Sequence, residues 1–328
     1  MAPPYAVRRL LLPLILAVEA AVAVLLLCVG LVGLLAAPLD RRLRAPRLAA
    51  MGVSYIAVEW AGLAALLAVW LAGPFRGRAW RDRADLAVTG WALGRVLAAA
   101  GATVGFSMQV DEPDVPGPFA ESDPVLVLAR HGGIGDSFAL VWLLASRYRR
   151  RPRVVLKQVL QWEPLIDVAL SRMGACFLPP SANPAERLES RVAALAGDLA
   201  PGQALLIFPE GGNWTPSRRT RAIRRLWASR KTAAARAAAL MDHVLPPRAG
   251  GVLACLDTRP EIPVVVVAHT GLDKITTAGQ LWAAIPFTTA MTIRWWPPAH
   301  PPYGDGERIE WLTTEWAVID QWIDARSA

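Results

Sequence analysis

His131 and Asp136 enclose the run Gly132-Gly133-Ile134-Gly135, and this pairing could perform acid–base chemistry. Glycine tolerates positive φ, so the backbone between the two side chains can fold into a sharp turn. On such a turn the Asp136 carboxylate can reach one imidazole nitrogen of His131 and leave the other nitrogen open. An imidazole held in this way can accept a proton, so we expect His131 to act as a general base oriented by Asp136.

The sequence on either side of this pair predicts the elements that position it. Residues 125–129 are a continuous apolar run, typical of a buried strand, and residues 137–144 have the pattern of a helix. No G-x-S-x-G motif surrounds Ser137, so we interpret it as a helix-start residue and not as a nucleophile. The same spacing recurs at His300 and Asp305, where two prolines stiffen the turn. We interpret this second copy as a solvated loop.

A second block delivers a carboxylate into a glycine turn. Residues 205–208 predict a strand that ends at Pro209 and is followed by Glu210-Gly211-Gly212-Asn213. Because two glycines follow Glu210, backbone amides of this turn are free to meet a phosphate or a hydroxyl. The alternative is an ordinary strand exit with a solvated glutamate.

A basic segment follows this turn. Residues 217–240 contain eight Lys or Arg and no Asp or Glu: Arg218, Arg219, Arg221, Arg224, Arg225, Arg230, Lys231 and Arg236. We expect Arg218 and Arg219, which lie close to Glu210 in the sequence, to contact phosphate. The distal basic residues are expected to form a solvated helix face.

The composition of the whole chain favours anionic and lipid partners. The 328 residues carry a net charge of +8 and are 54% hydrophobic, with a mean hydropathy of +0.33. Such a charge attracts lipid headgroups, CoA phosphates or nucleic acid, but no nucleic-acid-binding module is recognisable, so nucleic acid is not an expected partner. The three scattered cysteines support neither a disulfide framework nor a metal site.

Two long apolar segments predict a helical hairpin in or across a membrane. Residues 10–37 are apolar apart from Glu19, and as a helix they would be about 42 Å long, enough to cross a bilayer with tilt. Residues 51–75 follow a basic hinge and contain Glu59. The first run is too long for the apolar region of a cleaved signal peptide. We expect both glutamates to face protein or headgroups, with a functional site as the alternative. The hairpin either spans the bilayer or enters one leaflet.

Charge around the hairpin predicts its orientation. Six arginines flank its outer ends against four in the hinge, which favours a cytoplasmic N-terminus and catalytic side at the inner or plasma membrane. A third segment, residues 85–102, carries Arg95 and is expected at the membrane surface or against the remaining domain. The predicted division is a membrane hairpin over residues 1–75 and a catalytic domain over residues 76–328.

Short strands alternate with helices beyond residue 102, which predicts an α/β domain with a mixed, largely parallel sheet flanked by helices. The expected strands are 104–110, 124–129, 153–156, 204–208, 251–256, 262–268 and 289–296. The expected helices are 137–149, 162–173, 184–199, 217–241 and 307–325.

Together, the strand–HxxxxD–helix block and the later strand–FPEG block resemble the glycerolipid acyltransferase family, which includes 1-acylglycerol-3-phosphate O-acyltransferases. The resemblance covers roughly residues 103–270. Lys157 opens a K-x-x-L-x-x-x-P run that is similar to the start of the family's acceptor region, and residues 262–265 resemble its late proline-containing block. Residues 243–251 look like the segment after FPEG in the phospholipid-remodelling branch.

Three features depart from the family pattern. The family often reads E-G-T-R where this chain has Glu210-Gly211-Gly212-Asn213, so the arginine expected to grip a phosphate is missing. Residues 174–180 lack the usual Asp-Arg pair. His269, with Asp273 four residues on, is a rival base, but no FPEG-type partner follows it and we interpret it as structural.

The resemblance implies a glycerol-3-phosphate acyltransferase-like fold and transfer of a fatty acyl group from acyl-CoA or acyl carrier protein, without a cofactor, to a lysophospholipid hydroxyl. The first choice of acceptor is 1-acylglycerol-3-phosphate, which would give phosphatidic acid. His131 would be the general base, and the amides of the Gly132–Gly135 turn would stabilise the oxyanion. The expected substrate-binding residues are Gly132, Gly133, Lys157, Glu210, Gly211, Gly212, Asn213, Arg218 and Arg219.

Three alternatives remain open from the sequence. The acceptor could be another lysophospholipid or a glycolipid. Water could replace the acceptor, which would make the protein a lipid hydrolase. A membrane-anchored lipid-binding protein with a retired site is the alternative outside enzymes.

Overall fold

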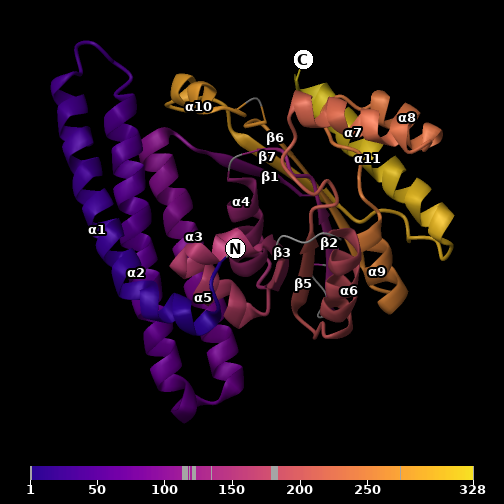
Figure 1. Ribbon diagram of the computed structural model, residues 1–328, viewed down its shortest axis with the longest axis horizontal. Coiled ribbons are helices and arrows are strands. Elements are labelled where there is room, and N and C mark those ends of the chain that lie inside the picture. The colour runs from indigo at the N-terminus through magenta and orange to yellow at the C-terminus, as the bar shows by residue number, and fades with distance from the viewer. Residues whose placement is uncertain are drawn as a thin grey trace.

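Seven strands of the described chain form one mixed sheet (Figure 1). The computed structural model describes residues 2–112, 117, 119, 123–133, 135–178, 184–273 and 275–327, without the side chains of 184–187 and 327. The order is β1-β7-β6-β2-β5-β3-β4, and every neighbouring pair is parallel except β6 and β7. This confirms the predicted mixed, largely parallel sheet. The strands are β1 (Met108–Asp111), β2 (Val125–Ala129), β3 (Arg151–Lys157), β4 (Cys176–Leu178), β5 (Gln203–Ile207), β6 (Val264–Thr270) and β7 (Met291–Trp296).

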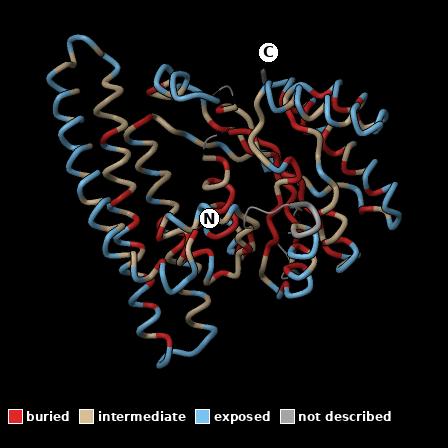
Figure 2. The backbone as a smooth tube through the Cα atoms, in the orientation of Figure 1, coloured by how far each residue is buried: buried red, intermediate tan, exposed pale blue. Residues whose placement is uncertain are grey.

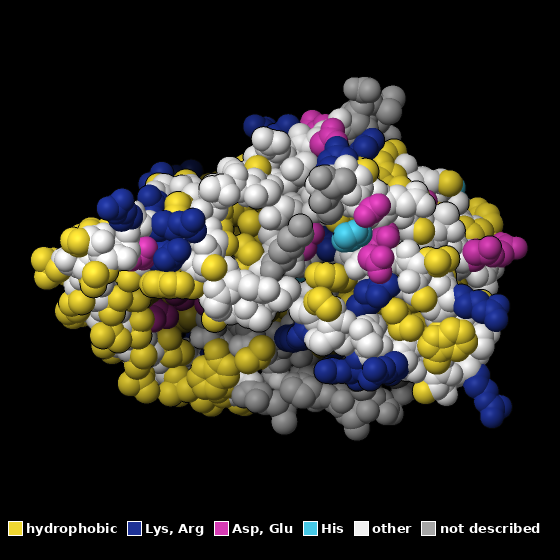
Figure 3. Space-filling view, turned by 90° about the horizontal axis from the view of Figure 1, so that it is seen from above, with side chains coloured by type: hydrophobic (Ala, Val, Ile, Leu, Met, Phe, Trp, Pro, Cys, Tyr) yellow, Lys and Arg dark blue, Asp and Glu magenta, His cyan; other side chains and the backbone are white. Residues whose placement is uncertain are grey.

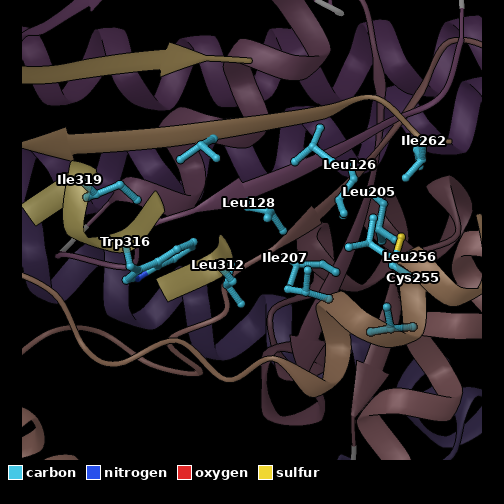
Figure 4. Packing of buried hydrophobic residues seen from close by; sticks show 14 of the residues in the cluster. Leu126, Leu128, Leu205, Ile207, Cys255, Leu256, Ile262, Leu312, Trp316 and Ile319 are labelled. Carbon is cyan, nitrogen blue, oxygen red and sulfur yellow. The ribbon is translucent and has the colours of Figure 1, made fainter. Parts of the chain in front are cut away.

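Helices cover both faces of the sheet, which explains why its central strands are apolar on both sides. On one face lie α6 (Pro184–Gly197), α8 (Thr232–Ala239), α9 (Gly250–Thr258) and α11 (Asp305–Ser327). Figure 4 shows Leu312, Trp316 and Ile319 of α11 beside Leu128 and Ile207 of the sheet. The opposite face is covered by α4 (Asp136–Trp142) and a π-helical turn (Leu143–Arg147). The remaining helices of this domain are α5 (Pro164–Met173), α7 (Pro216–Ala228) and α10 (Ala278–Ala284), with a 3-10 turn (Gln158–Trp162) before α5.

The N-terminal part consists of α1 (Tyr5–Leu35), α2 (Arg44–Arg76) and α3 (Arg78–Val104). All three are long and apolar enough to cross a membrane, which fits the predicted hairpin. Figure 2 shows that α1 is largely exposed while the strands are buried, and Figure 3 shows apolar side chains gathered over these helices. α3 packs against α2, α4 and α5, as expected for a segment lying against the domain.

The two glutamates of the hairpin face protein groups, as predicted. Trp60 Nε1 donates to Glu19 Oε2 at 2.8 Å, and Glu59 is 2% exposed. A carboxylate placed in lipid without a partner is costly. Glu19 has a hydrogen-bond partner, and Glu59 is enclosed by protein, although its Oε1 has no hydrogen-bond partner within the described residues.

A buried ion pair ties α1 to the α/β domain. Arg8 donates from Nε and Nη2 to the two carboxylate oxygens of Asp167 on α5, each at 3.0 Å, and Arg9 donates to the same carboxylate at 3.0 Å. The side chains of Arg8 and Asp167 are 9% and 1% exposed. The start of the membrane hairpin is therefore fixed to the domain that carries the sheet.

Several predicted elements were wrong. Residues 251–256 are not a strand but belong to α9, because a short apolar run does not distinguish a buried strand from a buried helix. The basic segment 217–241 is two helices, separated at Arg230, whose φ is +57°. α3 continues to Val104, so β1 starts only at Met108. β4 and α10 were not predicted, and Pro179 and Pro180 lie outside the described residues.

Replacing Asp167 with alanine should destabilise the protein by about 3–5 kcal/mol, because it leaves the buried Arg8 guanidinium without its carboxylate. The free energy of unfolding in detergent micelles measures this. The control is Asp111→Ala, which breaks the more exposed 3.2 Å pair with Arg326 and should cost less than about 1 kcal/mol. Equal losses in the two variants would contradict the proposed tie.

Candidate active site

The site lies where three adjacent parallel strands end. β6, β2 and β5 are neighbours and run parallel, so the loops that follow them leave the same edge of the sheet. Two hydrogen bonds join the loops after β2 and β5. Trp214 N donates to His131 O at 2.7 Å, and His131 N donates to Glu210 Oε2 at 3.4 Å. The structure thus brings together the two blocks that the sequence analysis paired.

His131 and Asp136 form the predicted hydrogen-bonded pair. His131 Nδ1 lies 2.8 Å from Asp136 Oδ2. Because an ionised carboxylate only accepts, Nδ1 carries the proton and Nε2 is left as the basic nitrogen. The side chain of His131 is 21% exposed and that of Asp136 is 3% exposed. The imidazole is therefore the member of the pair that a substrate can reach.

The glycine amides of the turn bind Asp136 and do not remain free. Gly132 N and Gly133 N donate to Asp136 Oδ2 at 3.0 and 3.3 Å. In this structure these two amides are engaged by a charged acceptor and are not free to bind an oxyanion, so that role stays a prediction for the other amides of the Gly132–Gly135 turn. Gly135, with φ of +84°, turns the chain into α4, and Ile134 lies outside the described residues.

The other carboxylate oxygen of Asp136 belongs to the start of α4. Oδ1 accepts from Ser137 N at 2.6 Å and from Ser137 Oγ at 3.1 Å, in agreement with the interpretation of Ser137 as a helix-start residue. Burial would raise the pKa of Asp136, but hydrogen bonds and charges from His131 and His269 outweigh it and hold that pKa well below its ordinary value. Asp136 is therefore ionised across the neutral range.

Glu210 is buried, which contradicts the alternative of a solvated strand exit. It is 2% exposed, and its Oε1 accepts from Trp316 Nε1 of α11 at 3.1 Å. Burial raises the pKa of Glu210 to about 8, opposed by the charge of Arg130 and by donors from Trp316, His131 and Leu245. From its buried position, the Glu210 carboxyl accepts from the backbone amide of His131 and so stabilises the loop that carries it. The sequence analysis missed Trp316, because no motif links α11 to this turn.

An arginine that the sequence analysis did not single out covers the second turn. Gly211 has a φ of +68°, and a Cβ built on it would lie 3.2 Å from Cζ and Nη1 of Arg248. Arg248 N donates to Pro209 O at 2.9 Å, which holds the segment in place. Within the described residues, the Arg248 guanidinium has no hydrogen bond or ion pair. The available signal was its place in the segment 243–251, which resembles the family.

Asn213 and Arg218 lie at this turn as predicted. Asn213 Nδ2 donates to Gly133 O at 3.4 Å, so the two glycine turns are in contact. Arg218 Nη1 donates to Asn213 O at 2.9 Å and lies 3.5 Å from a Cβ built on Gly212. Two guanidinium groups therefore lie close to this turn, that of Arg218 near Gly212 and that of Arg248 near Gly211.

Arg219 and Lys157 are placed differently. Arg219 donates to the carbonyls of Met241 and Ala239 and pairs with Asp242 at 2.7 Å. It fastens α7 to the end of α8 and is not aimed at the turn. Lys157 is the exposed last residue of β3, the strand next to β5, so it lies at the same edge of the sheet.

His269 is buried and does not pair with Asp273. It is 2% exposed; its Nε2 lies 3.0 Å from Arg130 O and 3.4 Å from Asp136 Oδ2. Asp273 instead contacts Arg130 at 3.3 Å and Thr270 at 2.9 Å. A base with this burial cannot meet an acceptor hydroxyl, so His269 is not a rival to His131. Within the described part of the chain, no three His, Cys, Asp or Glu side chains gather in a way that could hold a metal ion.

Residues 113–270 match the family model described as Acyltransferase. This part of the chain is an acyltransferase-family domain. The match runs from just before β2 to the end of β6, so it contains both glycine turns and His269. The N-terminal helices and α11 lie outside it.

Two curated relatives that match the chain are also acyltransferases by name. The mitochondrial glycerol-3-phosphate acyltransferase 2 of Rattus norvegicus is 30% identical over 150 residues, and that of Mus musculus is 29% identical over 150 residues. Each alignment covers 44% of this chain and 18% of the relative, so the chain spans less than a fifth of the length of these relatives. No solved structure matches the chain.

Replacing His131 with alanine, or Asp136 with asparagine, should lower kcat/KM for acyl transfer by at least about 100-fold, because the first removes the base and the second its orienting carboxylate. A radiolabelled acyl-transfer assay on purified protein measures this. The control is His300→Ala, in the second HxxxxD copy, where Nδ1 faces Pro301 O at 2.9 Å and not Asp305. Substantial transfer by the His131 variant would contradict the assignment.

Replacing Glu210 with glutamine should flatten the pH dependence of stability. A carboxyl whose pKa rises from 4.5 to about 8 on folding keeps in the folded state a proton that the unfolded state has released. Between these pH values, stability therefore falls as pH rises. The free energy of unfolding, measured from about pH 5 to 8, should fall more steeply for the wild type than for the variant. Parallel curves would contradict the burial argument.

Proposed function

We propose that this protein transfers a fatty acyl group from the thioester of acyl-CoA or acyl carrier protein to the free hydroxyl of a lysophospholipid. The first choice of acceptor is 1-acylglycerol-3-phosphate, with phosphatidic acid as the product. The observation that carries the proposal is the 2.8 Å contact between His131 Nδ1 and Asp136 inside an acyltransferase-family domain. Because this contact occupies Nδ1, the Nε2 atom of the partly exposed imidazole is free to accept the proton of a hydroxyl.

The reaction needs one base and no covalent enzyme intermediate. His131 Nε2 takes the proton of the acceptor hydroxyl as its oxygen attacks the thioester carbonyl. The tetrahedral intermediate then collapses, the carbon–sulfur bond breaks, and the thiolate takes the proton from the imidazolium. Asp136 is ionised throughout and stabilises the imidazolium while it exists. General-base catalysis of this kind contributes roughly 100- to 10,000-fold.

A phosphate on the acceptor is supported by the cations at the second turn. Arg248 lies over Gly211, where the absence of a side chain leaves room for a close approach. Arg218 reaches the carbonyl of Asn213 in the same turn. Where the family's E-G-T-R motif has an arginine, this chain has Asn213, and Arg248 and Arg218 supply positive charge at the turn instead. Guanidinium groups bind phosphate through paired hydrogen bonds. Lys157 is a further cation at this edge.

The helices α1 to α3 support a membrane lipid as substrate. They are long and apolar enough to cross a membrane, which supports a substrate and a product that reside in a bilayer. The arginine distribution supports an inner or plasma membrane location, with the site on the cytoplasmic side where acyl-CoA and acyl carrier protein are made available.

A second acceptor is favoured by the names of the relatives. Both are called glycerol-3-phosphate acyltransferases, and glycerol 3-phosphate offers the same pairing of a hydroxyl with a phosphate. It lacks the acyl chain that would hold a lysophospholipid in the bilayer, so the two acceptors are separable by assay.

An acceptor panel tests the proposal. Purified protein in vesicles is given palmitoyl-CoA or palmitoyl carrier protein with 1-acylglycerol-3-phosphate, glycerol 3-phosphate, lysophosphatidylcholine or no acceptor. The expected result is phosphatidic acid formation that depends on 1-acylglycerol-3-phosphate. Release of free fatty acid without acceptor would indicate a hydrolase, and no turnover with any combination would favour a lipid-binding protein.

Replacing Arg248 or Arg218 with alanine should raise KM for the phosphate-bearing acceptor by roughly 10- to 100-fold, the size of a lost charge-assisted hydrogen bond. KM for the acyl donor should change little. Arg224→Ala is the matched control, because Arg224 is an exposed arginine of α7 away from the turn. An unchanged acceptor KM in both site variants would contradict the phosphate assignment.

A further inference from the structure

A second histidine lies behind the carboxylate that orients His131. His269, on β6, is 2% exposed and places Nε2 at 3.4 Å from Asp136 Oδ2. The same oxygen accepts from His131 Nδ1 at 2.8 Å. One carboxylate oxygen thus lies between two imidazoles, one partly exposed and one buried.

The neighbours of His269 determine its tautomer. Nε2 lies 3.0 Å from the carbonyl oxygen of Arg130, and a carbonyl can only accept, so Nε2 carries the proton. The hydrogen bond of this N–H goes to the carbonyl. Nε2 also lies 3.4 Å from Asp136 Oδ2, so the positive end of the N–H dipole is close to the carboxylate. Arg130 Nη1 in turn donates to His269 O at 2.7 Å, which holds β6 against the end of β2.

His269 packs closely against the turn that carries His131. A Cβ built on Gly132 would lie 2.9 Å from His269 Cε1 and 2.4 Å from Arg130 Nη1. The glycine therefore permits the close approach of both side chains to the loop that carries His131. This is a physical reason for glycine at the first position of the turn.

We propose that His269 is a positioning residue, whose Nε2–H lies beside Asp136 Oδ2 and thereby sets how strongly Asp136 binds the imidazolium of His131. The proposal rests on the proposed acyl transfer by His131. His269 itself touches no substrate, because it is buried behind the carboxylate.

The charged and titratable groups around this unit come from three loops. Arg130, after β2, is 0% exposed and pairs with Asp273, after β6, at 3.3 Å. Glu210, after β5, approaches from the other side through the amide of His131. The remaining donor, Ser137 of α4, binds the far oxygen of Asp136. These side chains stay in place as residues when His269 is replaced, and a variant that keeps a donor at the position of Nε2 separates the effect of the N–H from the loss of packing.

Loss of this donor has a predictable direction. With one donor fewer, the negative charge of Asp136 is less dispersed and stabilises protonated His131 more strongly. The base is then lost at a higher pH, so the acid limb of kcat/KM should move to higher pH by about one unit, with a drop that approaches roughly 10-fold on that limb.

Three substitutions separate this role from simple packing. His269→Gln carries an amide donor with the reach of Nε2, His269→Asn carries one with the reach of Nδ1, and His269→Leu carries none. We expect the glutamine variant to keep the wild-type acid limb, and the asparagine and leucine variants to share the shift. His300→Leu is the control at an exposed histidine. If the leucine variant fails to fold, the comparison of glutamine with asparagine still decides.

A readout without turnover keeps this inference distinct from the proposed function. The rate at which diethyl pyrocarbonate modifies His131, followed by mass spectrometry from about pH 5 to 8, reports its protonation with no substrate present. Its profile should move to higher pH in the asparagine and leucine variants only. Identical profiles in wild type and all variants overturn the positioning role, whereas absence of acyl transfer in the wild type overturns the proposed function alone.

Discussion

The carboxylate of Asp136 is almost completely buried, and protein donors stabilise its charge. Two glycine amides, the amide and hydroxyl of Ser137, and the imidazole of His131 all point at its two oxygens. Burying a charge is tolerable only when such donors replace water. The same bonds fix the turn, start α4 and select the tautomer of His131, so the local fold and the chemistry share one set of contacts.

The sheet brings together site residues that the glycine turn alone could not bring together. His131, Glu210 and His269 are far apart in the sequence, yet they follow the adjacent strands β2, β5 and β6. Parallel strands covered on both faces end at one edge, so three loops meet there and a residue from α11, Trp316, closes the back of the site. The N-terminal helices are joined to this unit through Arg8 and Asp167, which couples membrane attachment to the position of the site.

The sequence could predict whatever depends on local pattern. Three predictions rest on residues that are close together in the sequence, and each was confirmed. They are the strand before His131, the hydrogen bond between His131 and Asp136, and the long apolar helices at the N-terminus. Long-range placement was not accessible in this way. Nothing near Glu210 in the sequence indicates that Trp316 binds its carboxyl or that Arg248 lies against Gly211, and the burial of His269 follows only from strand order. The apolar run at 251–256 fits a strand or a helix equally well, so only tertiary packing, in which α9 lies against α6, decides for a helix.

The central claim is that His131 activates the acceptor hydroxyl for direct attack, with no acyl group passing through the protein. The most direct test is to mix the wild-type protein with acyl donor, with and without 1-acylglycerol-3-phosphate, quench during turnover and measure its intact mass. The account predicts unmodified protein while phosphatidic acid accumulates. An acyl adduct that forms on donor alone, maps to Ser137 and disappears on adding acceptor would contradict it.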